Sequence, residues 1–66
     1  MNDEYIRRNL LHRNAVEAWA DIGAVIDRLC TRGTAPKWLI TILDRAHNKA
    51  YDVSKEMARH RDEVKP

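Results

Sequence analysis

Apolar residues recur along two long stretches of this chain at alternating steps of four and three residues. An α-helix completes a turn about every 3.6 residues, so residues with this spacing line up along one side of a helix. We therefore predict two helices, each with one apolar seam. The predicted seam residues are Leu11, Ala15, Ala18, Ile22, Val25 and Leu29 in the first helix and Leu39, Leu43, Ala46, Ala50, Val53 and Met57 in the second.

A short break separates the two stretches, and it contains both a glycine and a proline. Gly33 suits the left-handed conformation that often follows a helix. Thr34 suits the N-cap of the second helix, and Pro36 suits its first turn. We therefore predict an all-α fold, in which helices over about residues 3–30 and 35–62 form an antiparallel two-helix hairpin.

The two predicted seams can be paired in a single register. If the helices run antiparallel, Leu29 faces Leu39 beside the turn, and every later layer keeps the same relation between residue numbers. In that register Ala18 faces Ala50, so we expect the two backbones to approach closely at this layer.

The chain is too short to build a large core. Its 66 residues form one helical-hairpin domain, residues 1–66, and a chain of this size buries only about 60% of its unfolded surface. Cys30 is the only cysteine, which excludes an internal disulfide and favours a reducing compartment. Cys30 and the three histidines lack the spacing of a zinc site, so no metal is expected. Oligomerisation is the remaining support, and we expect a homo-oligomer that forms a four-helix or larger bundle.

A second stripe runs along the second helix, about 100° from the predicted seam. Together the two stripes cover more of the helix than one partner helix can contact. We therefore expect the second stripe to form the contact between subunits. Its candidate interface residues are Ile40, His47, Tyr51 and Ala58. An adaptor or inhibitor of another protein would use the same face.

No sequence motif indicates catalysis. The chain contains no Walker-type phosphate loop, no nucleophile elbow and no His-Glu-x-x-His zinc motif. A two-helix hairpin also offers little concavity from which water could be excluded. We therefore expect a protein that is not an enzyme and needs no cofactor.

Charge and hydropathy limit the other classes of function. The 12 basic and 10 acidic residues leave a net charge of +2, which is too small to imply nucleic acid by itself. No apolar run approaches the roughly 20 residues of a membrane-spanning helix. The N-terminus begins Met1-Asn2-Asp3-Glu4 and is too acidic for a secretory signal. We expect a cytoplasmic protein without a membrane partner.

Basic residues gather where the hairpin brings the two chain ends together. The candidate ligand-binding residues there are Tyr5, Arg7, Arg8, Arg59 and Arg61. An arginine fork can donate two parallel hydrogen bonds to a phosphate, and a tyrosine ring can stack on a base. The commoner arrangement of such residues is a solvated rim of surface ion pairs, so both interpretations stay open.

The second helix resembles that of a known family. The residues that carry the likeness are Leu39, Leu43-Asp44-Arg45-Ala46, Ala50 and Arg59, and they resemble the small phage anti-CBASS sponges. Those proteins are helical hairpins that oligomerise and sequester cyclic nucleotides between subunits. The resemblance implies an oligomeric, phage-type anti-defence protein with a phosphorylated nucleotide ligand. The segment from Thr31 to Pro36 departs from that family, and the hairpin is also similar to the dimeric plasmid RNA-binding proteins of the Rop type.

Three hypotheses follow for the function. The first is a non-enzymatic oligomer that sequesters a small phosphorylated nucleotide. The second is an adaptor or inhibitor that binds a host protein through the face of the second helix. The third is a Rop-like dimer that binds RNA or DNA, which the small net charge does not favour.

Overall fold

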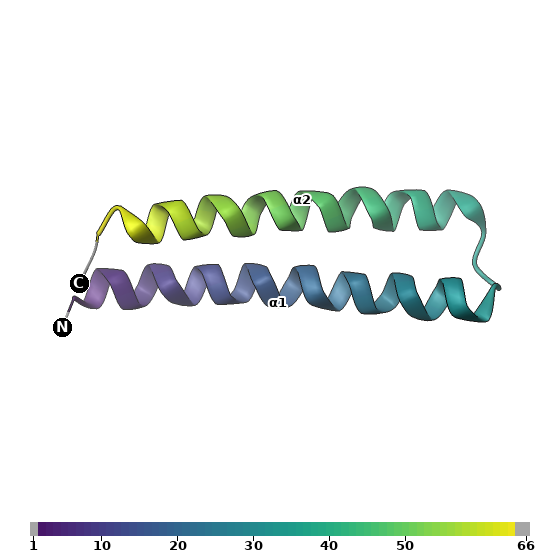
Figure 1. The fold of residues 1–66 in the computed structure, drawn as a ribbon, viewed down its shortest axis with the longest axis horizontal. Helices are drawn as coiled ribbons and strands as arrows, with labels where there is room; N and C mark the ends of the chain where they lie inside the picture. The colour runs from purple at the N-terminus through teal and green to yellow at the C-terminus, as the bar shows by residue number, and fades with distance from the viewer. Residues whose placement is uncertain (1, 65–66) are drawn as a thin grey trace.

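The protein is a long, thin pair of antiparallel helices (Figure 1). The computed structural model describes residues 2–64, with α1 at Asp3–Arg32 and α2 at Lys37–Asp62. Its Cα atoms extend over 49 × 15 × 10 Å. The start of α1 and the end of α2 lie together, at what we call the open end, and the connecting turn lies at the other end. The predicted all-α hairpin is confirmed.

The two ends of α1 are capped by side-chain and backbone hydrogen bonds. At its start, Asn2 Oδ1 accepts from the backbone N–H groups of Glu4 (3.0 Å) and Tyr5 (3.3 Å), which satisfies donors that the helix leaves free. At its end, Gly33 has φ 67° and donates its backbone N–H to the Leu29 carbonyl at 3.0 Å. Gly33 therefore has the predicted left-handed role, although α1 runs two residues further than expected, to Arg32.

The start of α2 differs from the prediction. Pro36, not Thr34, is the N-cap residue, with φ −66° and ψ 149°. Its carbonyl accepts from the backbone N–H groups of Leu39 (3.1 Å) and Ile40 (3.3 Å). A proline carries no side-chain acceptor, so the first turn of α2 has no side-chain cap.

The seam between α1 and α2 keeps half of the predicted residues and replaces the other half. The residues common to both are Ala15, Ile22, Leu29, Leu43, Ala50 and Met57. Four residues of the predicted seam face solvent: Leu11, Val25 and Val53 are 48%, 44% and 49% exposed, and Ala18 is also exposed. The heptad spacing is retained, but both helices are rotated. The observed seam consists of Arg8, His12, Ala15, Trp19, Ile22, Ile26 and Leu29 of α1 and Ile40, Leu43, His47, Ala50, Ser54, Met57 and Arg61 of α2.

An aromatic cluster occupies the middle of this seam, where we had expected a layer of Ala18 and Ala50. The Trp19 ring stacks on the His47 ring at 5.4 Å between centroids, and the Tyr51 ring lies 5.6 Å away at a tilt of 46°. Gly23 makes room for this packing, because a Cβ there would lie 3.2 Å from His47 Nε2. The bulky Trp19 ring fills the space between the helices and so turns Ala18 outward.

The hairpin has almost no interior. Among residues 2–64, no hydrophobic residue is buried, and Ser54, at 6% exposure, is the only buried polar residue. Its hydroxyl donates to the Tyr51 carbonyl at 2.6 Å. Two helices alone cannot enclose a side chain on all sides, so the packing energy within one copy is small.

Candidate functional site

One long face of the hairpin is apolar. Leu11, Ala18 and Val25 directly precede the seam residues His12, Trp19 and Ile26, and Leu39, Ala46 and Val53 directly precede Ile40, His47 and Ser54. Each therefore lies about 100° from the seam, in the same rotational sense. Because the helices are antiparallel, an equal rotation in the same sense brings both sets to one side of the hairpin. These six residues are the apolar face.

The opposite side of the hairpin carries both apolar and polar residues. The apolar residues that directly follow seam residues there are Val16, Gly23, Cys30, Tyr51 and Ala58. Six further residues directly follow His12, Trp19, Ile26, Ile40, His47 and Ser54, and we call them the polar face. Its members are Arg13, Ala20 and Asp27 of α1 and Thr41, Asn48 and Lys55 of α2. Only Ala20 among them is apolar.

Four of the six residues of the apolar face are exposed to solvent, and Leu39 and Ala46 are half-buried. Leu11, Val25 and Val53 are each nearly half exposed, and Ile42 at the edge of the face is 53% exposed. Asn14, Asp21, Arg28, Lys49 and Glu56 alternate with these apolar residues on the same side. Single exposed apolar residues are common, but exposed apolar residues that recur along one side of a small protein are typical of an interaction surface.

The predicted interface residues occupy other positions. His47 lies in the seam, against Trp19 and Gly23, and Ile40 and Ala58 are half-buried. Tyr51 is 46% exposed, leans on Trp19 and lies under Lys55 Nζ at 5.2 Å. None of them belongs to the apolar face: Ile40 and His47 lie in the seam, and Tyr51 and Ala58 lie on the opposite side of it, so their predicted role between subunits stays a prediction.

At the open end, Arg8 ties the start of α1 to the end of α2. Its Nε donates to Glu4 Oε1 at 2.8 Å, and its guanidinium donates to the His60 carbonyl, also at 2.8 Å. Glu63 lies 3.7 Å away, and the Arg8 side chain is only 19% exposed. The hydrogen bond from Arg8 lowers the pKa of the Glu4 carboxyl below its usual value of 4.5.

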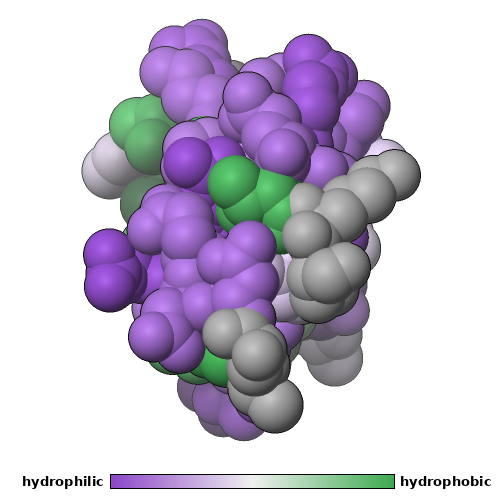
Figure 2. Space-filling view, turned by 90° about the vertical axis from the view of Figure 1, so that its left-hand side faces the viewer, coloured by the Kyte–Doolittle hydropathy of each residue, from purple (hydrophilic) through white to green (hydrophobic). Residues whose placement is uncertain are grey.

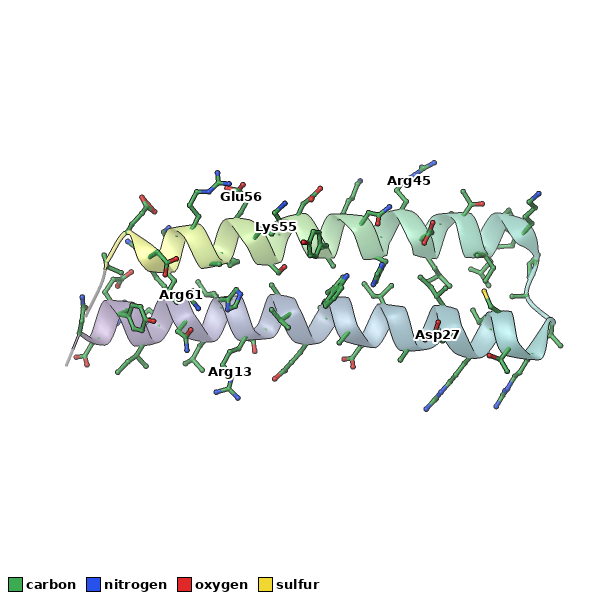
Figure 3. The ribbon with its side chains drawn as sticks, in the orientation of Figure 1. Arg13, Asp27, Arg45, Lys55, Glu56 and Arg61 are labelled. Atoms are coloured by element: carbon green, nitrogen blue, oxygen red, sulfur yellow. The ribbon has the colours of Figure 1, made fainter. Side chains whose placement is uncertain are left out.

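Arg61 makes the reciprocal connection from α2. Its guanidinium donates to Asn9 Oδ1 at 3.1 Å and lies 3.4 Å from His12 Nδ1, and its Nε donates to Asp62 at 3.0 Å. Figure 3 shows Arg61 between the helices, whereas Arg13 points outward from the hairpin. The side chain of Arg61 is 22% exposed. Both Arg8 and Arg61 therefore use their donors within the hairpin.

Arg7 and Arg59 are the freer arginines of the predicted ligand site. Their side chains are 74% and 73% exposed, and each pairs with a glutamate on its own helix, Glu4 at 3.4 Å and Glu56 at 3.3 Å. Figure 3 shows Glu56 pointing away from α1. Arg7 directly precedes the seam residue Arg8, so it lies beside the apolar face on α1, whereas Arg59 lies on α2. One hairpin therefore does not bring these two arginines to a common point. Tyr5 is half-buried on α1, and Figure 2 shows the open end as mainly hydrophilic.

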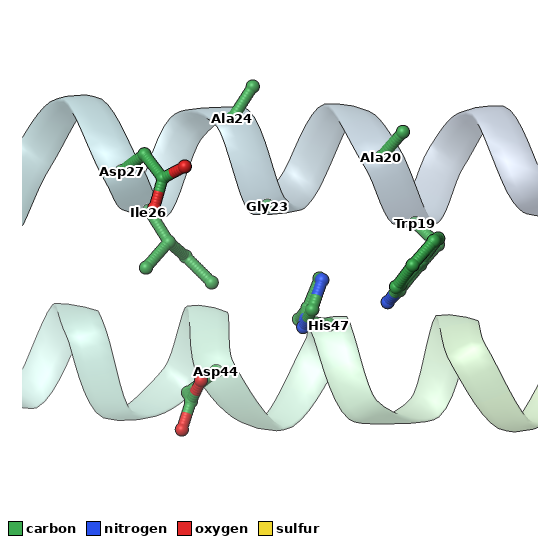
Figure 4. A pocket seen from close by; sticks show the side chains of 8 residues that line it. All are labelled: Trp19, Ala20, Gly23, Ala24, Ile26, Asp27, Asp44 and His47. Carbon is green, nitrogen blue, oxygen red and sulfur yellow. The ribbon is translucent and has the colours of Figure 1, made fainter.

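A shallow groove of about 510 Å³ lies on the side of the seam opposite the apolar face (Figure 4). It combines small residues of α1 with an aromatic wall and two carboxylates. Its lining residues are Trp19, Ala20, Gly23, Ala24, Ile26, Asp27, Asp44 and His47. The groove contains no pairing of a nucleophile with a base. Within residues 2–64, no three His, Cys, Asp or Glu side chains lie close enough to hold a metal ion, and neither described helix could span a membrane.

Comparisons with known proteins add no relative. No protein-family model matches the chain, and no curated protein or solved structure is significantly similar to it.

Proposed function

We propose that this protein is a non-enzymatic, oligomeric binding protein that works through protein–protein contacts at its apolar face. The observation that carries the proposal is the contrast between that face and the interior. Large apolar side chains are exposed along the hairpin, while no hydrophobic residue among residues 2–64 is buried. Apolar surface gains about 25 cal/mol per Å² when it leaves water, so a partner on this face supplies the burial that one copy lacks.

The geometry favours protein contacts over a phosphate ligand. Arg8 and Arg61, two of the four candidate arginines, are engaged between the helices. A phosphate that bound them would have to replace hydrogen bonds that join α1 to α2, and a hydrogen bond from a charged donor contributes about 1.5–3 kcal/mol.

The test compares two substitutions on α2 by analytical ultracentrifugation over a wide range of concentrations. Wild-type protein should sediment as an oligomer that dissociates on dilution. Val53→Glu places a charge on the apolar face and should shift the protein to the monomer. Asn48→Glu places the same side chain on the polar face and should leave the oligomer unchanged. A wild-type protein that stays monomeric at every concentration would disprove the proposal of self-association.

A second candidate function is the sequestration of a small phosphorylated nucleotide, as in a phage anti-defence sponge. The observation that favours it is the exposure of Arg7 and Arg59, whose surface pairs are worth only about 0–1 kcal/mol and can yield to a phosphate. Calorimetric titration with cyclic and linear nucleotides tests it. Binding by the wild type that an Arg7→Ala, Arg59→Ala variant loses would support the nucleotide ligand, and no binding by the wild type would exclude the nucleotides tried.

A further inference from the structure

We propose that two copies of the chain pack apolar face against apolar face, with both connecting turns at the same end of a four-helix bundle. In this bundle a two-fold axis runs parallel to the helices, and α1 of each copy lies against α2 of its partner. The inference rests on the proposed self-association and specifies its geometry.

The side of the hairpin that carries the apolar face is comparable in size with one partner's share of a stable contact. The hairpin measures 49 by 15 Å across its Cα atoms, and a standard interface buries about 800 Å² per partner. A two-fold contact uses the same patch on both copies, so one apolar face is sufficient. Both copies then bury the exposed side chains of Leu11, Val25 and Val53.

Two arrangements of such a dimer are geometrically available. If the two-fold axis runs along the helices, the turns share one end and α1 faces the partner's α2. If the axis crosses the helices, the turns lie at opposite ends and α1 faces the partner's α1. Neighbouring helices are antiparallel in both cases, so helix packing alone does not decide between them.

The register of the first arrangement has no freedom. Rotation about an axis parallel to the helices leaves every residue at its height along the bundle. Each residue of α1 therefore lies level with the same residues of the partner's α2 as of the α2 in its own copy. Within one copy Trp19 contacts Tyr51, and Gly23 lies against His47. Asp21 is midway between Trp19 and Gly23 along α1. Lys49 is midway between His47 and Tyr51 along α2. Asp21 of one copy is therefore level with Lys49 of the other.

Charge selects this arrangement. Asp21 directly precedes the seam residue Ile22, and Lys49 directly precedes Ala50, so both lie at the edge of the apolar face, where each meets the other across the contact. The two-fold axis makes this attraction twice. The opposite arrangement, centred on the middle of α1, sets Arg7 level with the partner's Arg28 and Lys49 level with the partner's Glu56, so repulsion and attraction offset each other and no net attraction remains. Such rim charges fix the orientation of an interface.

Disulfide trapping tests the geometry in a Cys30→Ser background, which removes the only natural thiol. Ala18 and Val53 lie on the apolar face at nearly the same level, so a mixture of the Ala18→Cys and Val53→Cys single variants, in which no copy can form an internal disulfide, should form a covalent heterodimer on mild oxidation, as measured by intact mass. Ala18→Cys alone should not, because the two α1 helices lie on a diagonal of the bundle. Efficient cross-linking by Ala18→Cys alone would establish the opposite arrangement and overturn the inference.

Sedimentation of the same samples separates the two levels of the proposal. A non-covalent dimer that cross-links neither in the mixture nor in Ala18→Cys alone would overturn this geometry but leave self-association standing. A monomer under all conditions would overturn both.

Charge exchange gives an independent readout. Asp21→Lys and Lys49→Asp should each raise the dimer dissociation constant by about fivefold or more, and the double exchange should restore it. Asp27→Lys makes the same change on the polar face of α1 and should leave the constant unaltered. An equal effect of Asp27→Lys, or no recovery in the double variant, would contradict the proposed pairing.

Discussion

Arg61 shows how a charged residue can hold two helices together. Its guanidinium reaches Asn9 and His12 on α1, and its side chain is 22% exposed. Because hydrogen bonds from a charged donor contribute about 1.5–3 kcal/mol, Arg61→Ala should lower the free energy of unfolding by about 1–2 kcal/mol. Arg59→Ala, two residues away and 73% exposed, should change it by less than about 0.5 kcal/mol. Urea unfolding followed by circular dichroism compares the two, and equal losses would contradict a linking role for Arg61.

Glu4 makes part of the stability depend on pH. Its pKa is lowered in the folded protein by the hydrogen bond from Arg8, so its contribution is complete above the usual value of 4.5 and is lost as the pH falls through the folded pKa. Glu4→Gln does not titrate. The stability difference between the wild type and Glu4→Gln should therefore be constant near neutral pH and shrink in acid. A difference that stays constant down to the acid transition would contradict this assignment.

At the scale of the helix, the sequence predicted that two helices form, and where they end, better than it predicted which face of each helix packs against the other. Gly33 allowed the end of α1 to be located closely, because few residues adopt φ 67° as readily as glycine. The heptad pattern marks only the mean direction of an apolar arc. Because Trp19 lies next to Ala18, the apolar arc of α1 is wide enough for α2 to pack against either residue. The packing of the Trp19 ring between the helices decided that Trp19, and not Ala18, lies in the seam. The exposed apolar face could not be separated from the seam before the rotation was known.

The turn after α1 depends on the left-handed backbone of Gly33. Gly33→Ala forces a Cβ into a left-handed backbone, which costs about 1–2 kcal/mol, so we expect the free energy of unfolding to fall by about 1 kcal/mol. Thr34→Ala should be nearly neutral, since Pro36 is the N-cap. Thermal or urea unfolding of both variants checks this. A larger effect at Thr34 than at Gly33 would restore the capping role first predicted for the threonine.

At the scale of the whole molecule, assembly and the open end are connected. In the proposed bundle both open ends lie at one end, so the exposed Arg7 and Arg59 of two copies come to the same region of the surface. Arg7, which lies beside the apolar face, then approaches the partner's α2. A phosphate site that uses both arginines needs two subunits, so any nucleotide binding found for the wild-type protein should be absent from Val53→Glu.

The stability of the whole molecule should depend on its concentration. When folding and dimerisation are coupled, mass action raises the unfolding midpoint as the concentration rises. A tenfold change in concentration is worth about 1.4 kcal/mol per dimer, and with an unfolding entropy of about 2.1 cal/mol/K per residue this corresponds to about 5 °C. Scanning calorimetry at several concentrations measures the shift. The charge in Val53→Glu should prevent this variant from burying the apolar face against a second copy. The variant should therefore melt at a lower temperature that does not depend on concentration. A wild-type midpoint that is independent of concentration would mean that the hairpin folds without a second copy, and its sparse interior would then need another source of stability.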